Sequence, residues 1–364
     1  MKHLIVCCDG TWNRPDQIAQ GVAAPTNVAK IALALADADG EGNTQCVHYQ
    51  AGVGTRRGER LLGGGLGVGL SRNVQECYGF LVDNYEPGDQ LYFFGFSRGA
   101  FTARSTVGLV RNSGILRRAH RHRIKDAYRL YRDPRRDTEP SGIAAELFRR
   151  SYSHPEAYVH FVGVWDTVGA LGIPIDGFRP PRLSRMWAFH DTKLSRYVRN
   201  AYHAIAIDER RRPFRPTLWE QHEEPPEEQT LEQVWFAGVH CDVGGGYRDP
   251  ALSEIPLLWM AGKARDCGLA FKPDRLVRVE NPTHEHRRSG IQLAPDPYGE
   301  KHESRNRFYQ LFPAHDRRLG VENGGKVAGG WVASSARLRY EKDGGYRPPG
   351  LKEWLDDDGD VTDV

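Results

Sequence analysis

A serine lies between two glycines where an apolar run meets a helical pattern. Gln90–Phe94 is the apolar run, Gly95-Phe96-Ser97-Arg98-Gly99 follows it, and Ala100–Arg111 has helical spacing. A strand that turns tightly into a helix holds such a serine in a strained conformation, and side chains at 95 and 99 would clash with the backbone. The helix N-terminus adds positive potential where an oxyanion would form. The stretch predicts a nucleophile at Ser97; the plainer interpretation is a serine that caps the helix.

Other short apolar runs alternate with helical patterns along the chain. The expected strands are Leu4–Cys8, Cys46–Gln50, Gln90–Phe94, Val159–Trp165, Ala201–Ile207 and Gln233–Val239, and the expected helices are Asn27–Ala36, Asn73–Tyr85, Ala100–Arg111 and Ile255–Cys267. This alternation predicts an α/β fold, with a mostly parallel central sheet and helices on both faces. In such sheets ligands bind at the carboxyl ends of the strands.

A nucleophilic serine needs a base, and the base needs an orienting carboxylate. Asp166 directly follows the run Val159–Trp165, and His240 directly follows Gln233–Val239 and precedes three glycines at 244–246. Glycines let a backbone pass close to a ligand. The order serine, acid, histidine is that of α/β-hydrolases. We therefore predict Asp166 as the acid and His240 as the base, against the plainer interpretations of a turn-forming aspartate and a buried structural histidine.

A second assignment keeps the same order along the chain. Asp242 would be the acid and His302, in Lys301-His302-Glu303-Ser304, would be the base. In the preferred assignment Asp242 instead supports the loop beside His240. Both assignments stay open at the level of the sequence.

The first apolar run ends in Asp9-Gly10-Thr11, which points into the same crevice. A backbone N–H of Gly10 or Thr11 would complete an oxyanion hole with the N–H of Arg98, since one donor usually follows the nucleophile and the other comes from another loop. Asp9 would order the site, or the stretch is an ordinary turn. Asp9 and Asp242 could also bind a metal, but two carboxylates are few for a protein-held cation, so we expect neither a metal nor a cofactor.

The length of 364 residues allows one large domain or two. Because the candidate site residues extend from Asp9 to His240, we expect residues 1–364 to form a single domain. Four prolines in residues 208–230 predict an excursion from the sheet. A weak pattern after Gly268 predicts an irregular C-terminal cap or lid over about 270–350. Gly52–Gly69, with eight glycines and no Gly-Lys-Ser/Thr ending, predicts a loop and not a Walker motif.

The net charge of +3 is unevenly distributed. Residues 111–137 hold ten Arg and Lys and three Asp, whereas residues 351–364 hold one Lys and six Asp and Glu. The remainder is nearly neutral, which excludes the broad basic field of a nucleic-acid-binding protein. The basic run is interpreted either as a solvated helix face or as a peripheral contact with anionic lipid headgroups.

Neither a membrane span nor a signal peptide is expected. No run reaches 18 apolar residues, and the apolar run at the N-terminus is five residues long and ends at Asp9. The six cysteines (7, 8, 46, 77, 241 and 267) form no Cys-x-x-Cys pair and no zinc spacing. We expect reduced thiols in a protein made in the cytoplasm, whose export would use a route that needs no signal peptide.

Five motifs in this order resemble one protein family. They are Cys8-Asp9-Gly10-Thr11-Trp12-Asn13, Gly95-Phe96-Ser97-Arg98-Gly99-Ala100-Phe101, Val164-Trp165-Asp166-Thr167-Val168-Gly169, Ala206-Ile207-Asp208-Glu209 and Gly238-Val239-His240-Cys241-Asp242-Val243-Gly244-Gly245-Gly246-Tyr247. Together they resemble the α/β-hydrolase domain of type VI secretion phospholipase effectors, from Lys2 to about Leu269 and more faintly to Pro348. Position 241 departs from the family pattern, with Cys where Ser is expected, and we expect no large C-terminal membrane-anchoring portion.

The resemblance implies an esterase of glycerophospholipids, with Ser97 as nucleophile, His240 as general base and Asp166 as orienting acid. It implies a lipid or small ester as substrate, and secretion or immunity proteins as partners. Two other classes compete with this interpretation: a non-catalytic module that keeps the fold, and a metal-assisted hydrolase. An elbow, an acid and a base in one chain favour the enzyme over the non-catalytic module.

Overall fold

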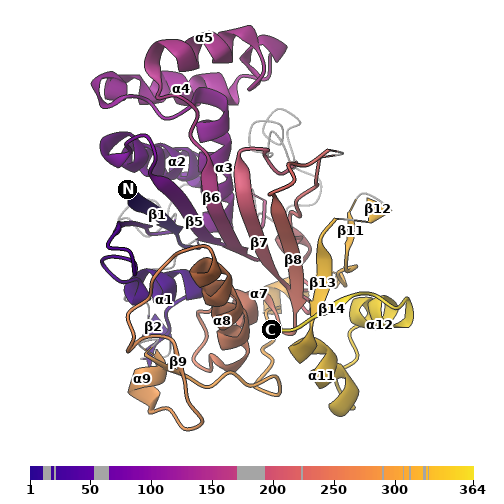
Figure 1. Ribbon diagram of the computed structural model, residues 1–364. Helices are drawn as coiled ribbons and strands as arrows, with labels where there is room; N and C mark the ends of the chain where they lie inside the picture. The colour runs from indigo at the N-terminus through magenta and orange to yellow at the C-terminus, as the bar shows by residue number, and fades with distance from the viewer. Residues whose placement is uncertain are drawn as a thin grey trace.

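A parallel sheet of eight strands forms the centre of the molecule (Figure 1). The computed structural model describes residues 1–10, 18–19, 22–52, 65–169, 193–222, 224–288, 291–305, 307–310, 313–322, 325–326 and 328–364. In spatial order the strands are β14 (Val361–Thr362), β13 (Gly330–Ala333), β8 (Thr230–Phe236), β7 (Val198–Ala206), β6 (Val159–Trp165), β5 (Gln90–Phe96), β1 (Lys2–Cys8) and β4 (Thr44–Gln50). All seven pairings between these neighbours are parallel. The predicted parallel α/β fold is confirmed.

Helices cover both faces of this sheet (Figure 1). On one face lie α1 (Asn27–Ala34) and α8 (Ala251–Asp266), and on the other lie α2 (Gly65–Asn84) and α3 (Arg98–Ser113). Strand β1 contributes to both cores, because its side chains alternate between the faces. Ile5 and Cys7 pack with α1 and α8, whereas Leu4, Val6 and Cys8 pack with α2 and α3. A strand buried on both faces is apolar throughout, which explains the unbroken run in the sequence.

An arm of short helices extends from the amino end of the sheet (Figure 1). It consists of η2 (Arg118–Arg123), α4 (Ile124–Arg132), η3 (Arg136–Thr138) and α5 (Ile143–Tyr152). Both α4 and α5 contact α3. The basic run of the sequence forms most of this arm.

The chain after β7 adds short elements and, beyond β8, two further strands of the central sheet. The short elements are η4 (Arg212–Phe214), α7 (His240–Gly244), β9 (Val277–Arg278), α9 (His284–Arg288), β10 (Gln292–Leu293), α10 (Arg307–Gln310), β11 (Val321–Glu322), β12 (Gly325–Lys326), α11 (Ser334–Lys342) and α12 (Pro349–Asp356). Strands β13 and β14 extend the sheet beyond β8. Strand β13 lies within the region of about 270–350 that the sequence analysis expects as a cap, and β14 follows that region. Between β7 and β8, η4 lies in the segment 208–230 for which the prolines predict an excursion.

The short strands β2 (Ile18–Ala19) and β3 (Val22–Ala23) form a separate antiparallel pair. The glycine-rich stretch lies partly outside the described residues, and α2 begins within it, at Gly65. None of the helices in the described ranges has the length and apolar character needed to cross a membrane.

Candidate active site

Ser97 lies in a sharp turn between β5 and α3. Its backbone has a φ of 58° and a ψ of −123°, a conformation that is rare for a residue with a side chain. The flanking glycines make this turn sterically feasible. A Cβ at Gly95 would lie 2.6 Å from the Cα of Ala100, and a Cβ at Gly99 would overlap the carbonyl oxygens of Cys8 and Asp9. Ser97 makes no side-chain capping hydrogen bond to the helix, contrary to the plainer interpretation.

The side chain of Ser97 instead meets His240, which meets Asp166. Oγ of Ser97 is 2.8 Å from Nε2 of His240, and Nδ1 of the same ring is 2.5 Å from Oδ2 of Asp166. All three residues are buried and lie directly after β5, β8 and β6, or one short turn beyond. Side chains at the carboxyl ends of β5, β6 and β8 of one sheet therefore form a single hydrogen-bonded chain.

The charges and burial around these three hydrogen-bonded residues favour an ionised Asp166 and a neutral His240. Burial alone would raise the pKa of Asp166, but the guanidinium of Arg317 and the hydrogen bond from His240 outweigh it and hold that pKa below its usual range. Burial lowers the pKa of His240 and is only partly opposed by Asp166. At neutral pH the ring of His240 is therefore uncharged and can accept a proton.

Arg317 is a component of the site that the sequence analysis missed. Its Nη1 lies 2.6 Å from Oδ1 of Asp166 and its Nη2 lies 3.0 Å from Oδ2. The same guanidinium donates to the carbonyl oxygens of Ala206 and Phe214. The N–H of Ala206 also donates to Oδ1 of Asp166, at 3.0 Å. These contacts fix the plane of the Asp166 carboxylate and thereby the orientation of His240.

Asp242 and His302, the alternative acid and base, form a pair of their own. Nδ1 of His302 is 2.6 Å from Oδ1 of Asp242, and the backbone N–H groups of Val239 and His302 donate to Oδ2. The ring of Tyr247 stacks on His302 with centroids 4.0 Å apart. Within the described structure His240, and not His302, is the histidine that contacts Ser97. The pair instead braces the loop that carries His240.

Asp9 and its neighbours lie at the end of β1. The carboxylate of Asp9 accepts hydrogen bonds from Thr26, Tyr49 and the N–H of Gly10. Asp9 therefore links β1 to β4 and to the start of α1. The N–H of Gly10 is engaged at 2.7 Å, so its predicted role as an oxyanion donor would require this bond to open. Thr11 lies outside the described residues.

The N–H of Arg98 is the other predicted oxyanion donor. It is the first N–H of α3, and no acceptor for it is found among the described residues. Such an N–H at a helix start is available to a ligand. The described part of the chain holds no cluster of three or more His, Cys, Asp or Glu side chains arranged to bind a metal ion.

Aromatic rings and a second acidic residue surround His240. The ring centroids of Phe96 and Phe214 lie 4.6 and 5.0 Å from that of His240. Gly244 lies so close to Phe96 that a Cβ there would overlap the ring, which explains the first of the three glycines. Glu209, to which the sequence analysis assigns no role, accepts a hydrogen bond from the N–H of His240 at 3.3 Å and forms an ion pair with Arg211.

A model of a known protein family matches the part of the chain that contains Ser97, Asp166 and His240. The model, described as the catalytic domain of Tle1-like phospholipase effectors of type VI secretion, matches residues 2–263. The chain belongs to this family. The match covers all five motifs, from Cys8 to Tyr247, but ends before Arg317.

Individual relatives share only part of their length with this member of the family. An uncharacterized protein of Saccharomyces cerevisiae is 30% identical over 235 residues, which is 59% of this chain and 32% of the yeast protein. The crystal structure of an uncharacterized protein from Pseudomonas aeruginosa is 17% identical with a TM-score of 0.45, over 80% of this chain and 49% of that one. The Tle1 effector bound to the VgrG spike of the type VI secretion system is 18% identical with a TM-score of 0.31, over 67% of this chain and 51% of that one.

In this member of the family the residue after His240 is Cys241. Burial raises the pKa of its thiol to about 12. The side chain therefore stays a neutral thiol at physiological pH, as a serine hydroxyl would stay neutral. The substitution adds no charge beside the histidine, and we expect it to leave the base unaffected.

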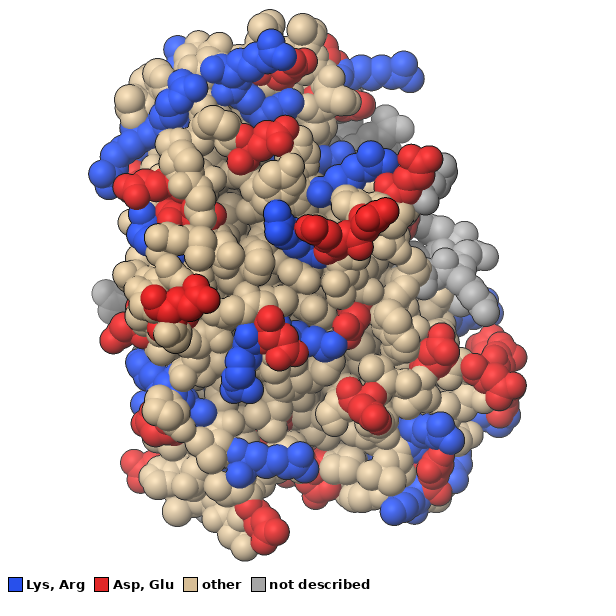
Figure 2. Space-filling model, viewed as in Figure 1, with Lys and Arg blue, Asp and Glu red and all other residues tan. Residues whose placement is uncertain are grey.

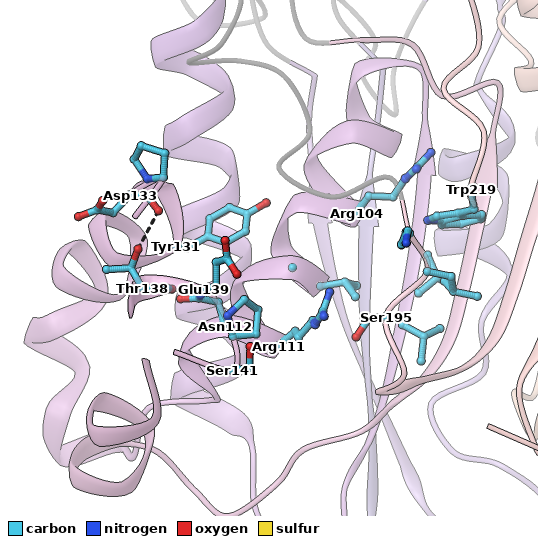
Figure 3. Close-up of a pocket in the computed structure, with 18 residues that line it drawn as sticks. Arg104, Arg111, Asn112, Tyr131, Asp133, Thr138, Glu139, Ser141, Ser195 and Trp219 are labelled. Carbon is cyan, nitrogen blue, oxygen red and sulfur yellow. Dashed lines mark hydrogen bonds between the residues drawn. The ribbon is translucent and has the colours of Figure 1, made fainter. Parts of the chain in front are cut away.

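A pocket of about 360 Å³ lies farther along α3 (Figure 3). Its lining includes Arg104, Arg111 and Asn112 of α3, together with Thr138 and Trp219. The guanidinium of Arg104 lies 4.4 Å from the ring centroid of Trp219. At 1.5 Å per residue, these parts of α3 lie about 10 to 22 Å from Ser97 along the helix axis. The pocket is therefore separate from the candidate active site around Ser97.

Proposed function

We propose that this chain is a serine esterase that hydrolyses the acyl esters of phospholipids. Ser97 is the nucleophile, His240 the general base and Asp166 the orienting acid. The observation that supports this proposal best is the continuous hydrogen-bonded chain Ser97–His240–Asp166, with its serine in a strained turn at a helix N-terminus. The description of the family supports the lipid substrate.

The reaction has two halves. Nε2 of His240 takes the proton of Ser97 as Oγ attacks the ester carbonyl, and the N–H of Arg98 donates to the oxyanion that forms. The intermediate collapses, the bond to the alcohol breaks, and His240 gives its proton to that alcohol. Water then attacks the acyl-enzyme with His240 again as base, which releases the fatty acid and restores Ser97.

The side chain of Arg98 supports a phosphate-bearing substrate. Burial lowers the pKa of its guanidinium to about 10, so it remains charged at neutral pH. No carboxylate of the described residues forms an ion pair with it. A partly desolvated cation beside the nucleophile is suited to a lipid phosphate, because burial strengthens its interaction with an anion.

Two further proposals concern where the protein acts. The exposed cations of the arm, which include Arg118, Lys125 and Arg136, are proposed to contact an anionic membrane surface. Figure 2 shows Lys and Arg side chains gathered at the end of the molecule formed by the arm. Because the family is described as one of type VI secretion effectors, we propose that the protein is exported by that system.

Replacement of the nucleophile tests the enzymatic proposal. Ser97→Ala should abolish hydrolysis of a short-chain nitrophenyl ester and labelling by a fluorophosphonate, while Ser141→Ala, at an exposed serine, should change neither. Lipid mass spectrometry of phospholipid vesicles should show fatty acid release by the wild type and by Ser141→Ala only. Failure of the wild-type protein to react with the fluorophosphonate would favour a non-catalytic module. Turnover that survives in Ser97→Ala would contradict the assignment of the nucleophile.

A further inference from the structure

Two cysteine side chains meet in the interior, close to the turn that holds Ser97. Cys8 is the last residue of β1 and Cys77 lies in α2, and their sulfur atoms are 3.6 Å apart. Both side chains are fully buried. All six cysteines are described and are free thiols, and this is the pair for which a contact between two sulfur atoms is observed.

The environment of the pair makes one thiol more reactive than the other. The hydrogen bond from Cys8 is the largest effect on Cys77 and, with the nearby ring of His48, lowers the pKa of that thiol to about 7 although burial opposes it. The same hydrogen bond and burial raise the pKa of Cys8. A thiolate attacks an oxidant, whereas a thiol does not. Cys77 is therefore the attacking sulfur and Cys8 the resolving one.

A route for a small oxidant lies on the outer side of His48. This residue lies on β4, and its ring stacks on Phe80 with centroids 5.1 Å apart. His48, Glu76 and Phe80 line a surface pocket next to α2. His48 also hydrogen-bonds to Cys77, so a molecule the size of hydrogen peroxide that enters this pocket contacts a direct neighbour of that thiol.

We propose that Cys8 and Cys77 form a reversible disulfide when the protein meets a peroxide. The Cys77 thiolate attacks one peroxide oxygen, the O–O bond breaks, and Cys77 becomes a sulfenic acid as water leaves. The sulfur of Cys8 then attacks this sulfur as its proton passes to the leaving hydroxyl group, which forms the S–S bond and releases a second water. Two thiols are oxidised and one peroxide is reduced to two waters. The sulfurs need to approach by about 1.5 Å.

The bond would join two layers of the fold beneath the nucleophile. It would connect β1 to α2 and close a loop of roughly 70 residues, which restricts the unfolded chain more than the folded one. The carbonyl oxygen of Cys8 lies against Gly99, the glycine that follows the turn of Ser97. The disulfide would therefore stabilise the carboxyl end of β1, against which the turn of Ser97 packs. It involves none of the proposed catalytic side chains.

The experiment treats the purified full-length chain with hydrogen peroxide at a few molar equivalents. The number of free thiols found by titration should fall from six to four. Peptide mapping without reductant should show the peptides of Cys8 and Cys77 joined. The melting temperature should rise by about 5 °C and return with dithiothreitol. Cys77→Ser should keep its remaining five thiols under this treatment. Cys46→Ser and Cys267→Ser should still form the bond.

Several results would overturn the proposal. Retention of all six thiols in the folded wild type would do so, as would a mapped bond between other cysteines. If Cys77→Ser does not fold, the mapping of the wild type decides alone. The Ser97→Ala protein should form the same disulfide, which separates this test from that of the proposed hydrolase.

Discussion

Asp166 accepts hydrogen bonds from the neutral ring of His240 and from the guanidinium of Arg317, and Arg317 fixes its position. A buried carboxylate that loses one charged partner keeps the cost of its desolvation, so Arg317→Met should reduce the free energy of unfolding by about 3–5 kcal/mol. Arg210→Met is the matched control, because Arg210 forms a half-exposed ion pair with Asp316 and should cost less than about 1 kcal/mol. Urea unfolding of both variants measures the difference. Equal losses would contradict the role of Arg317.

The pH dependence of stability should change in the same variant. The pKa of Asp166 is lowered in the folded protein, so its contribution to stability is present above the pKa of the unfolded chain and is lost as pH falls through the folded value. Arg317→Met raises the folded pKa, because the guanidinium of Arg317 helps to lower it. The loss of stability in acid that is due to Asp166 should therefore be smaller in the variant and should be complete at a higher pH. Unfolding at a series of pH values below 6 measures this shift.

The pKa of His240 determines the acid limb of the rate profile. Burial lowers this pKa from the usual value of about 6.5. The reaction needs a neutral imidazole, so kcat/KM for a short-chain ester should rise with pH as His240 loses its proton. Because the pKa of His240 is lowered, the midpoint of this rise should lie below pH 6.5. Initial rates from pH 4.5 to 8 measure the profile. A midpoint above 6.5 would contradict a buried, neutral base.

Arg98 should distinguish a phospholipid from a neutral ester. Arg98→Gln removes the cation but keeps the backbone N–H at the start of α3. Loss of a charged hydrogen bond to phosphate should reduce kcat/KM for a phospholipid by about 10-fold or more, while the rate with a neutral short-chain ester should change by less than about threefold. Parallel assays with both substrates measure the split. Equal losses would assign Arg98 to positioning of Ser97 and not to the phosphate.

At the scale of elements, the contact of α3 with β1 depends on Gly99. A Cβ at this position would overlap two backbone oxygens of β1, so Gly99→Ala should displace the start of α3, abolish ester hydrolysis and destabilise the protein. Gly262→Ala in α8 is the control, because no atom lies within 4 Å of its Cβ and alanine favours a helix by about 0.5–1 kcal/mol. Thermal unfolding and the ester assay test both variants. Normal activity in Gly99→Ala would contradict the close packing at the turn.

The sequence predicts those elements whose pattern is local. All six expected strands occur, and five of them are apolar runs that are largely buried, whereas β4 lies at the edge of the sheet and is partly exposed. Strands β13 and β14 were missed, since they have four and two residues and their positions depend on pairing with distant segments. Ser97, Asp166 and His240 are recognisable because each follows a strand. Arg317 lies 151 residues from Asp166, and a single arginine in an irregular segment has no local pattern that indicates a buried partner.

At the scale of the whole molecule, the basic arm and the candidate site lie at opposite ends of the sheet. Ser97 follows the carboxyl end of β5, and α3 runs back for 16 residues, or about 24 Å, to the end where the arm begins (Figure 1). The arm also presents Ile143 and Leu147 of α5, which are 61% and 56% exposed and lie one helical turn apart. A membrane bound by the arm would therefore lie away from Ser97.

This separation predicts that membrane binding and ester turnover respond to different substitutions. The double reversal Lys125→Glu and Arg136→Glu removes two exposed cations of the arm, each of which contributes about 1 kcal/mol near an anionic surface, so binding to phosphatidylserine-containing vesicles should fall about 30-fold or more. Turnover of a dissolved short-chain ester should stay unchanged, because no residue of the site moves. Lys272→Glu with Lys342→Glu makes the same change in net charge elsewhere on the surface and should weaken binding far less. Vesicle co-sedimentation at fixed ionic strength separates the two pairs, and equal losses would show that net charge, and not the arm, determines membrane binding.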